Sequence, residues 1–154
     1  MQKGNSAVAA ISVDKEISLV PYYTNVKAAL PWYQSEQLCM QVDGRPAPYS
    51  RERLLRMYRW LGARGQLFYI KYKGRLCGDI CLQESGEVNI VVAEPWQNRG
   101  IGSRALAAVA AMAKRQGYVK LFARVYSFNR QSQRMFEKVG FVRMDGELYC
   151  LNLE

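Results

Sequence analysis

Apolar residues recur along this chain in two rhythms, which together predict seven strands and four helices. Alternating apolar and polar positions in β-branched and aromatic runs are typical of strands, whereas apolar residues spaced three or four apart are typical of helices. The predicted strands cover residues 17–21, 66–72, 75–82, 87–92, 118–126, 141–144 and 148–151. The predicted helices cover residues 25–30, 50–61, a run from the glycines at 100 and 102 to 115, and 129–138. Residues 34–44 fit neither rhythm clearly.

Turn and cap residues mark the ends of several of these elements. Lys73-Gly74 separates two strand-like runs and predicts a hairpin. Ser50 and Asn129 precede helical runs as N-caps, and Gly140 follows one as its stop. Hairpins come first and strand–helix–strand units follow. This order predicts an α/β fold in which helices cover a mixed sheet.

The length of the chain fits one domain. A chain of 154 residues can bury a core without disulfides, and no repeat or linker divides it. We expect the domain over residues 16–154, after a flexible extension over residues 1–15. The apolar run in that extension is too short for a signal peptide, and no segment reaches the length of a membrane span. The expected location is cytoplasmic.

Composition narrows the chemistry that the chain can perform. It contains no histidine, which excludes a histidine base or triad and makes a zinc site hard to build. We predict no metal. The four cysteines form no C-x-x-C pair and are interpreted as buried thiols of a cytoplasmic protein. They are Cys39, Cys77, Cys81 and Cys150.

The positive charge of the chain indicates an anionic ligand. Lysine and arginine outnumber acidic residues 22 to 13, which gives a net charge of +9. Such a surface attracts nucleic acid, acidic membranes or a phosphorylated cofactor. The basic residues are spread along the chain without a dense block, so a nucleic-acid-binding module ranks last and no membrane partner is expected.

The stretch VVAEPWQNRGIGSR, residues 91–104, carries the clearest chemical signal. At the start of a helix, unpaired backbone N–H groups point outward, and Gly100 and Gly102 leave room for a phosphate to approach them. Arg99 and Arg104 add positive charge beside them. No Gly-Lys-Ser/Thr follows, which excludes a Walker A loop. The stretch fits G-x-G-x-x-A, but its distance from the strand argues against a dinucleotide-binding fold.

Two motifs in this chain resemble those of the GNAT superfamily of N-acetyltransferases. QNRGIG, residues 97–102, is similar to the family's Q/R-x-x-G-x-G/A signature. NRQSQRMFEKVGF, residues 129–141, is similar to its N-x-x-A/S-x-x-x-Y-x-x-x-G-F segment. The resemblance extends from Ile17 to the C-terminus in element order. It implies a mixed, mostly antiparallel sheet of about seven strands flanked by about four helices, with a splayed central strand pair.

The resemblance implies acetyl-CoA as the acetyl donor and assigns residues to it. The backbone of Val91, Val92 and Ala93 would meet the pantetheine arm, and Asn129 and Ser132 would contact the cofactor from the last helix. The residues assigned to the pyrophosphate are Gln97, Asn98, Arg99, Gly100, Ile101, Gly102, Ser103 and Arg104.

The catalytic residues are less clearly marked. Family members often place a tyrosine acid where this chain has Phe136. Tyr126 is the substitute candidate for protonating the departing thiolate, and its alternative role is packing. Glu87 is the candidate base that removes a proton from the amine, directly or through a water molecule, and its alternative is a solvent-facing position beside a turn. Asn89 shares the parity of Glu87 along the strand and could orient a water molecule there.

The acceptor is expected to be a primary amine of a small molecule or a peptide. The aromatic residues Tyr22, Tyr23, Trp32 and Tyr33 could line its site or belong to the core. The predicted function is an N-acetyltransferase. The alternative is a non-catalytic domain of the same fold that binds or senses acyl-CoA, and a homodimer is left open.

Overall fold

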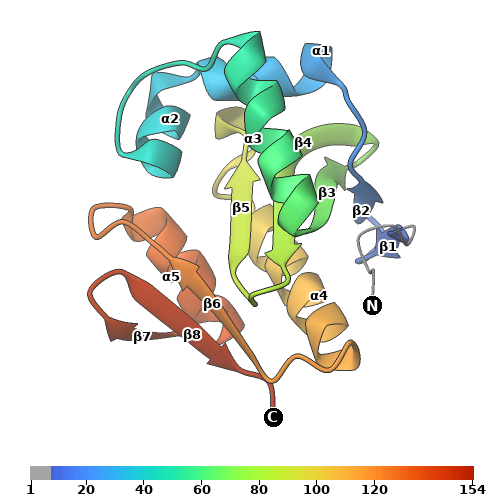
Figure 1. The fold of residues 1–154 in the computed structure, drawn as a ribbon, viewed down its shortest axis with the longest axis vertical. Coiled ribbons are helices and arrows are strands. Elements are labelled where there is room, and N and C mark those ends of the chain that lie inside the picture. Colours follow the sequence, from blue (N-terminus) through green and yellow to red (C-terminus); the bar gives the residue numbers. More distant parts are fainter. Residues whose placement is uncertain (1–7) are drawn as a thin grey trace.

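The computed structural model describes residues 8–154, and it contains two antiparallel sheets with helices packed against them (Figure 1). The strands are β1 (Ile11–Ser12), β2 (Ile17–Pro21), β3 (Gly65–Tyr72), β4 (Arg75–Gln83), β5 (Val88–Val92), β6 (Lys120–Arg124), β7 (Val142–Asp145) and β8 (Leu148–Asn152). The helices are α1 (Val26–Ala29), α2 (Glu36–Asp43), α3 (Arg51–Arg64), α4 (Ile101–Arg115) and α5 (Arg130–Val139), with short 3-10 helices η1 (Leu30–Gln34) and η2 (Glu94–Trp96).

The central strands β5 and β6 splay apart, as the sequence predicted. The larger sheet has the order β1-β2-β3-β4-β5 and the smaller one β6-β8-β7. The two sheets touch where Glu87 and Phe122 form an isolated parallel bridge, and the Phe122 N–H donates to the Gly86 carbonyl at 3.0 Å. Beyond that tie, β5 and β6 diverge (Figure 1). The α/β fold with mostly antiparallel strands is confirmed, with eight strands and five α-helices in the described residues rather than seven and four.

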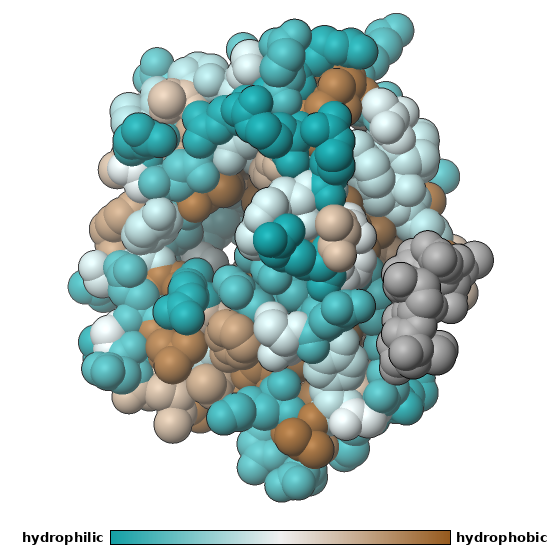
Figure 2. Space-filling view, viewed as in Figure 1, coloured by the Kyte–Doolittle hydropathy of each residue, from teal (hydrophilic) through white to brown (hydrophobic). Residues whose placement is uncertain are grey.

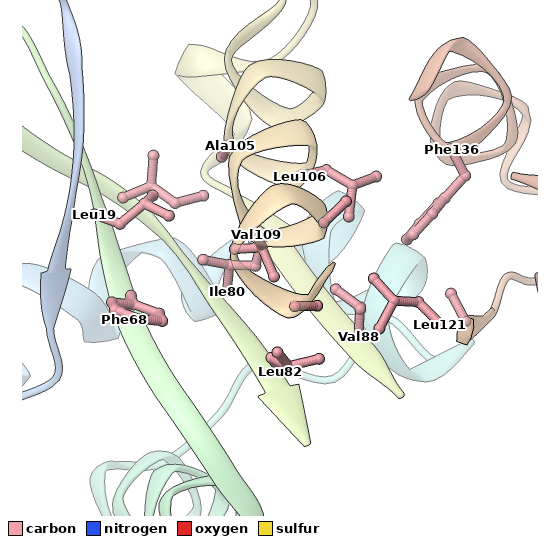
Figure 3. Close-up of a cluster of buried hydrophobic side chains, with 14 of the residues drawn as sticks. Leu19, Phe68, Ile80, Leu82, Val88, Ala105, Leu106, Val109, Leu121 and Phe136 are labelled. Atoms are coloured by element: carbon pink, nitrogen blue, oxygen red, sulfur yellow. The ribbon is translucent and has the colours of Figure 1, made fainter. Parts of the chain in front are cut away.

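Two hydrophobic layers cover the larger sheet. The first lies between the sheet and α4, where Leu106 and Val109 meet the strands and Phe136 approaches from α5 (Figure 3). The second lies under α1, α2 and α3 and contains Leu54 and Tyr58. Because residues that alternate along a strand point to opposite faces, both faces of β4 and β5 are covered.

Local sequence signals explain most helix ends. Ser50 and Asn129 cap α3 and α5, since their side chains accept hydrogen bonds from the backbone N–H groups of Arg53 and Ser132. Gly140 follows α5 in the left-handed conformation, with φ of +113°. The ambiguous residues 34–44 contain α2, which is capped by Ser35.

One boundary differs from the sequence prediction. The first helix, predicted over residues 25–30, is α1 (Val26–Ala29), and the 3-10 helix η1, with Pro31 in its first turn, continues the chain. The predicted extension, residues 1–15, lies partly outside the described residues, but Ile11 and Ser12 pair with Leu19 and Ser18 as β1. The sheet therefore begins before the predicted boundary at residue 16. Within residues 8–154, no helix is long and apolar enough to cross a membrane.

Candidate active site

A pocket of about 340 Å³ opens where β5 and β6 splay apart. Its walls come from β5, the loop before α4, the first turn of α4, the end of β6, α5 and α2. The surface is hollowed at this point, to the left of β5 (Figure 2). The predicted site residues that line it are Val91, Val92, Gln97, Asn98, Gly100, Ile101, Gly102, Ser103, Tyr126, Asn129 and Ser132.

The backbone of β5 presents only every second residue to this pocket. The Gln83 N–H donates to the Glu87 carbonyl at 2.9 Å, and the Ala93 N–H donates to the Cys77 carbonyl at 2.8 Å. Such positions alternate along an antiparallel pair, so residues 87, 89, 91 and 93 turn their backbone groups toward β4. The assignment of a cofactor-binding backbone to Val91 and Ala93 is therefore wrong, because their N–H groups are directed to β4.

The backbone groups of Ile90 and Val92 face the open side instead. On the opposite strand, the Val125 N–H donates to the Glu147 carbonyl at 2.8 Å, so Val125 is turned toward β8 and Arg124 toward β5. The two strand edges thus face each other across the pocket beyond the Glu87–Phe122 tie. An extended ligand with amide groups would fit between them by backbone pairing.

The loop before α4 is built to present backbone N–H groups. Asn98 and Gly100 have φ of +64° and +77°, which bends the chain sharply into the helix. The first intrahelical donor is the Arg104 N–H, which reaches the Gly100 carbonyl at 3.3 Å. The preceding N–H groups of the first turn have no intrahelical acceptor and carry the positive end of the helix dipole.

The two glycines serve different purposes. A Cβ on Gly100 would meet no atom within 4 Å, so this position needs glycine for its positive φ. A Cβ on Gly102 would lie 2.5 Å from the Met135 sulfur and 3.5 Å from Val92 Cγ2. Gly102 therefore allows α4 to approach α5 closely beside the pocket.

Gln97 holds this loop in place. Its Nε2 donates to the Val92 carbonyl at 2.8 Å and to Gln41 Oε1 at 2.9 Å. The Gln41 Nε2 donates back to Gln97 Oε1 at 3.4 Å. The side chain thus joins the last residue of β5, the loop before α4 and helix α2. Helix α2 supplies Leu38, Gln41 and Val42 to the pocket wall.

The two predicted phosphate arginines do not line the pocket. Arg104 Nη1 donates to Asp14 at 2.9 Å and to Glu16 at 3.0 Å, which directs it toward the N-terminal strands. The guanidinium of Arg99 lies 5.2 Å from the ring centre of Trp96 and donates to the Pro95 carbonyl at 3.3 Å. Both are corrections, because acids far away in sequence and a neighbouring ring hold these side chains elsewhere. The pocket's charges are instead Arg124, Arg134 and Lys138.

The two candidate catalytic residues fall in different places. Tyr126 lines the pocket, where its ring stacks on Phe128 at 5.1 Å between centroids and meets Gly44 at the end of α2. Glu87 is not part of the pocket lining, since it lies at the bridge that ties β5 to β6. Of the two routes expected for Glu87, direct or through water, the pocket lining does not support the direct one. Within residues 8–154, the lining contains no carboxylate.

A model of the acetyltransferase (GNAT) family matches residues 29–141 of the chain. The chain belongs to this family. No curated protein sequence matches it. The solved structures that resemble it share little sequence with it, so their resemblance shows the fold alone.

Three solved structures illustrate the resemblance of this acetyltransferase to others. A Salmonella typhimurium acetyltransferase that modifies the N-terminal serine of 50S ribosomal protein L7/L12 has a TM-score of 0.78 at 14% identity, covering 95% of this chain and 100% of the other. A GNAT acetyltransferase from Bacillus anthracis gives 0.79 at 16%, covering 94% and 99%. The microcin C7 self-immunity acetyltransferase MccE, in complex with acetyl-CoA and AMP, gives 0.73 at 12%, covering 91% and 94%.

On the other face of its sheet, this acetyltransferase buries a carboxylate that the sequence analysis missed. The Asp79 side chain on β4 accepts hydrogen bonds from the Tyr33 hydroxyl at 2.6 Å and the Tyr58 hydroxyl at 2.8 Å. Burial raises the pKa of Asp79 to about 6, although these two hydrogen bonds act in the opposite direction. The only sequence signal was an aspartate inside an otherwise apolar strand.

The aromatic residues proposed for the acceptor site pack mainly against one another. Trp32 and Tyr33 are buried in the layer under α1, α2 and α3, and Tyr22 packs against it. Tyr23 is half-exposed and contacts Tyr69 edge to face at 5.3 Å. None of the four lines the pocket, so in the described residues they belong to the core and its margin.

The cysteines are distributed as buried thiols with one exception. Cys39, Cys77 and Cys81 are buried, and Cys150 is half-buried. Burial raises the pKa of Cys77 and Cys81 to about 12, which keeps them protonated at neutral pH. Within residues 8–154, no group of three histidine, cysteine, aspartate or glutamate side chains could hold a metal ion.

Proposed function

We propose that this protein transfers the acetyl group of acetyl-CoA directly to an α-amino group, in the pocket between β5 and β6. The observation that carries the proposal is the slot itself. Two strand edges with inward-facing backbone groups lead to a helix N-terminus lined by Gly100, Ile101, Gly102 and Ser103. Amides along an extended arm would pair with the strands, and a phosphate group would meet the free N–H groups at the helix start.

The charges and polar groups of the pocket fit the donor. Arg124, Arg134 and Lys138 provide three cations beside the slot for the phosphates of acetyl-CoA. The Asn129 side chain caps α5 by accepting a hydrogen bond from the Ser132 N–H at 3.1 Å. We therefore assign these two residues a contact with the donor at the first turn of α5. Ile101 is buried, and its contribution is its backbone N–H.

The chemistry requires stabilisation of the carbonyl oxygen and departure of a thiolate. When the neutral amine attacks the carbonyl carbon, a C–N bond forms, negative charge develops on the carbonyl oxygen, and the nitrogen loses a proton to water. The Ile90 N–H faces the slot and is our candidate donor to that oxygen. The C–S bond then breaks, and because a thiol has a pKa near ~8.5 the thiolate leaves without strong assistance. Tyr126 is our candidate to donate a proton to it.

The absence of a carboxylate from the described pocket lining bears on the acceptor. Without a base in contact, the amine must arrive neutral or lose its proton to solvent. At pH of about 7.5, roughly a third of an α-amine with pKa near 7.8 is neutral, against roughly 0.1% of a lysine amine. The cations of the pocket shift both toward the neutral form. These considerations favour an α-amine acceptor.

Release of free thiol from acetyl-CoA tests the proposal. We expect release with a short peptide that has a free N-terminus and no lysine, and release at least about tenfold slower with an N-terminally blocked peptide that has one lysine. We also expect Glu87→Gln to leave the dependence of kcat on pH unchanged. Acetyl-CoA binding with no thiol release on any amine would instead identify a non-catalytic acyl-CoA-binding domain.

A further inference from the structure

Helix α3 presents a row of arginines to the surface on the side opposite its buried face. Its buried side chains are Leu54, Tyr58 and Leu61, which lie on one side of the helix. The helix contains five arginines and one glutamate, so it carries a large share of the chain's net charge of +9. Helical spacing places Arg56 and Arg59 opposite the buried side. Hydrophilic side chains gather over α3 at the front of the molecule (Figure 2).

Arg56 and Arg59 are free to engage a partner, whereas Arg53 and Arg64 are held by neighbouring residues. Arg53 is held by Asp43 at 3.0 Å and lies over the Tyr49 ring at 4.1 Å. Arg64 is also held, because its guanidinium lies 3.9 Å from the ring centre of Trp60 and donates to the Trp60 carbonyl at 3.4 Å. Within residues 8–154, Arg56 and Arg59 form no ion pair and are exposed. Five arginines with one glutamate on one helix is a costly arrangement for a solvated surface, since like charges at this spacing repel. An anionic partner would relieve that repulsion.

We infer that the outer face of α3 docks an acidic polypeptide segment whose N-terminus supplies the acceptor amine. This inference rests on the proposed function. From Arg56 to Arg59 the helix rises about 4.5 Å, a distance that two residues of an extended chain can span. Carboxylates on alternate residues of such a segment would lie within reach of these two arginines. The guanidinium fork suits carboxylate recognition.

The docking face is mechanically joined to the pocket. The Arg53–Asp43 ion pair links α3 to the last residue of α2, and the Tyr49 hydroxyl donates to the same carboxylate at 3.2 Å. Helix α2 lines the pocket through Leu38, Gln41 and Val42. A segment held on α3 would therefore lie on the side of the sheet from which α2 borders the reaction site.

Charge also separates this partner from two others. A polycationic acceptor would be repelled by the protein's net charge of +9 and by the three cations of the pocket. A single-stranded nucleic acid would need exposed aromatic faces for stacking. Trp60 is 47% exposed, but the guanidinium of Arg64 lies 3.9 Å from its ring centre and covers it. The face therefore favours an acidic polypeptide.

Fluorescence anisotropy with a defined probe tests this docking face. The probe is a peptide of about twelve residues with a free N-terminus, glutamate at alternate positions and a label at its C-terminus. Its control has glutamine in place of every glutamate. The protein variants are Arg56→Gln/Arg59→Gln and, as a match of equal charge elsewhere, Lys114→Gln/Arg115→Gln at the end of α4. Lys114 and Arg115 are exposed, so neither pair should disturb the core.

We expect the α3 double variant to raise the Kd of the acidic peptide about 5- to 10-fold at low salt and the α4 double variant less than about twofold. The glutamine peptide should bind neither the wild type nor the variants measurably. An equal loss in both variants would overturn the proposal, since only net charge would then matter. The proposal would also be overturned if the α3 double variant lost more affinity for an oligothymidylate of matched charge than for the acidic peptide. That result would make the face a nucleic-acid site.

A separate titration distinguishes failure of this inference from failure of the proposed function. Acetyl-CoA should bind the wild type and the α3 double variant with the same Kd, because α3 does not line the pocket. If acetyl-CoA binds but the acidic peptide shows no dependence on Arg56 and Arg59, the docking face is wrong, and the thiol-release assay still decides the proposed function. If acetyl-CoA does not bind the wild type, the proposed function fails.

Discussion

The side-chain amide of Gln97 donates to the backbone carbonyl of Val92 across 2.8 Å. Val92 is the last residue of β5, and its backbone faces the open slot rather than β4. Gln97 thereby satisfies a carbonyl that has no strand beside it and fixes where the loop leaves the sheet. Through Gln41 the same amide holds α2 against the loop. One side chain thus joins β5, the loop before α4 and α2 on one side of the pocket.

We expect Gln97→Ala to weaken acetyl-CoA binding by about 5- to 20-fold. Each lost hydrogen bond contributes about 0.5–1.5 kcal/mol, and the loop would no longer be fixed before α4. Isothermal titration measures the change. The matched control is Gln116→Ala, because Gln116 and Gln66 form a similar reciprocal amide pair at 2.7 and 3.0 Å away from the pocket. Equal affinity in wild type and Gln97→Ala would show that the loop does not depend on this amide.

Alanine at Gly100, the N-cap of α4, and at Gly102 in its first turn should lower the free energy of unfolding for different reasons. Gly100→Ala meets no atom but places a Cβ at a φ of +77°, which costs about 1–2 kcal/mol. Gly100→Asn should cost less, since asparagine tolerates this conformation. Gly102→Ala forces the Met135 sulfur, 2.5 Å away, to move. Adding Met135→Ala should therefore recover stability in the Gly102→Ala variant and not in the Gly100→Ala variant, as measured by urea unfolding. The reverse pattern would contradict this explanation.

The sequence predicted the parts of this site that depend on local backbone geometry. The glycines at the start of α4 and the Asn129 cap follow from which residues tolerate a left-handed backbone or accept a hydrogen bond at a helix start. The splayed strand pair followed from the family resemblance. Together these placed the loop, α5 and β5 correctly around the pocket.

The parts that sequence could not predict depend on partners far apart in the chain. Arg104 looked like a phosphate ligand, but its partners Asp14 and Glu16 lie about 90 positions earlier in the sequence. The assignment of Val91 and Ala93 required the hydrogen-bond phase between β4 and β5, which the apolar pattern does not contain. The sequence around Asp79 does not indicate its two tyrosine donors, because they come from η1 and α3.

The stability of the protein should fall as pH rises from about 4 to about 6 because of Asp79. Burial raises its pKa from 3.8 to about 6 in the folded protein. In this window the unfolded chain loses the proton while the folded one keeps it, so the unfolded state is favoured progressively and the effect levels off above pH of about 6. Urea unfolding at several pH values should show this decline in wild type but not in Asp79→Asn. Parallel profiles of the two proteins would contradict it.

Tyr126→Phe should lower kcat by less than about tenfold, because a thiol with a pKa near ~8.5 is a good leaving group without an acid. Phe136→Tyr should raise kcat by less than about tenfold for the same reason. Phe136 packs edge to face on Phe141 at 5.0 Å, so cofactor affinity must be measured alongside. A loss of about a hundredfold in Tyr126→Phe with unchanged affinity would make Tyr126 the required acid.

The binding of acetyl-CoA between β5 and β6 is tested most directly by amide NMR of the ¹⁵N-labelled protein. On addition of acetyl-CoA, we expect large shifts and slowed hydrogen exchange at the N–H groups of Ile90, Val92, Gly102 and Ser103. The N–H groups of Val91 and Ala93 should keep their exchange rates, because they already face β4. Protection of Val91 and Ala93 without change at Ile90 and Val92, or no change at the start of α4, would contradict binding of acetyl-CoA between β5 and β6.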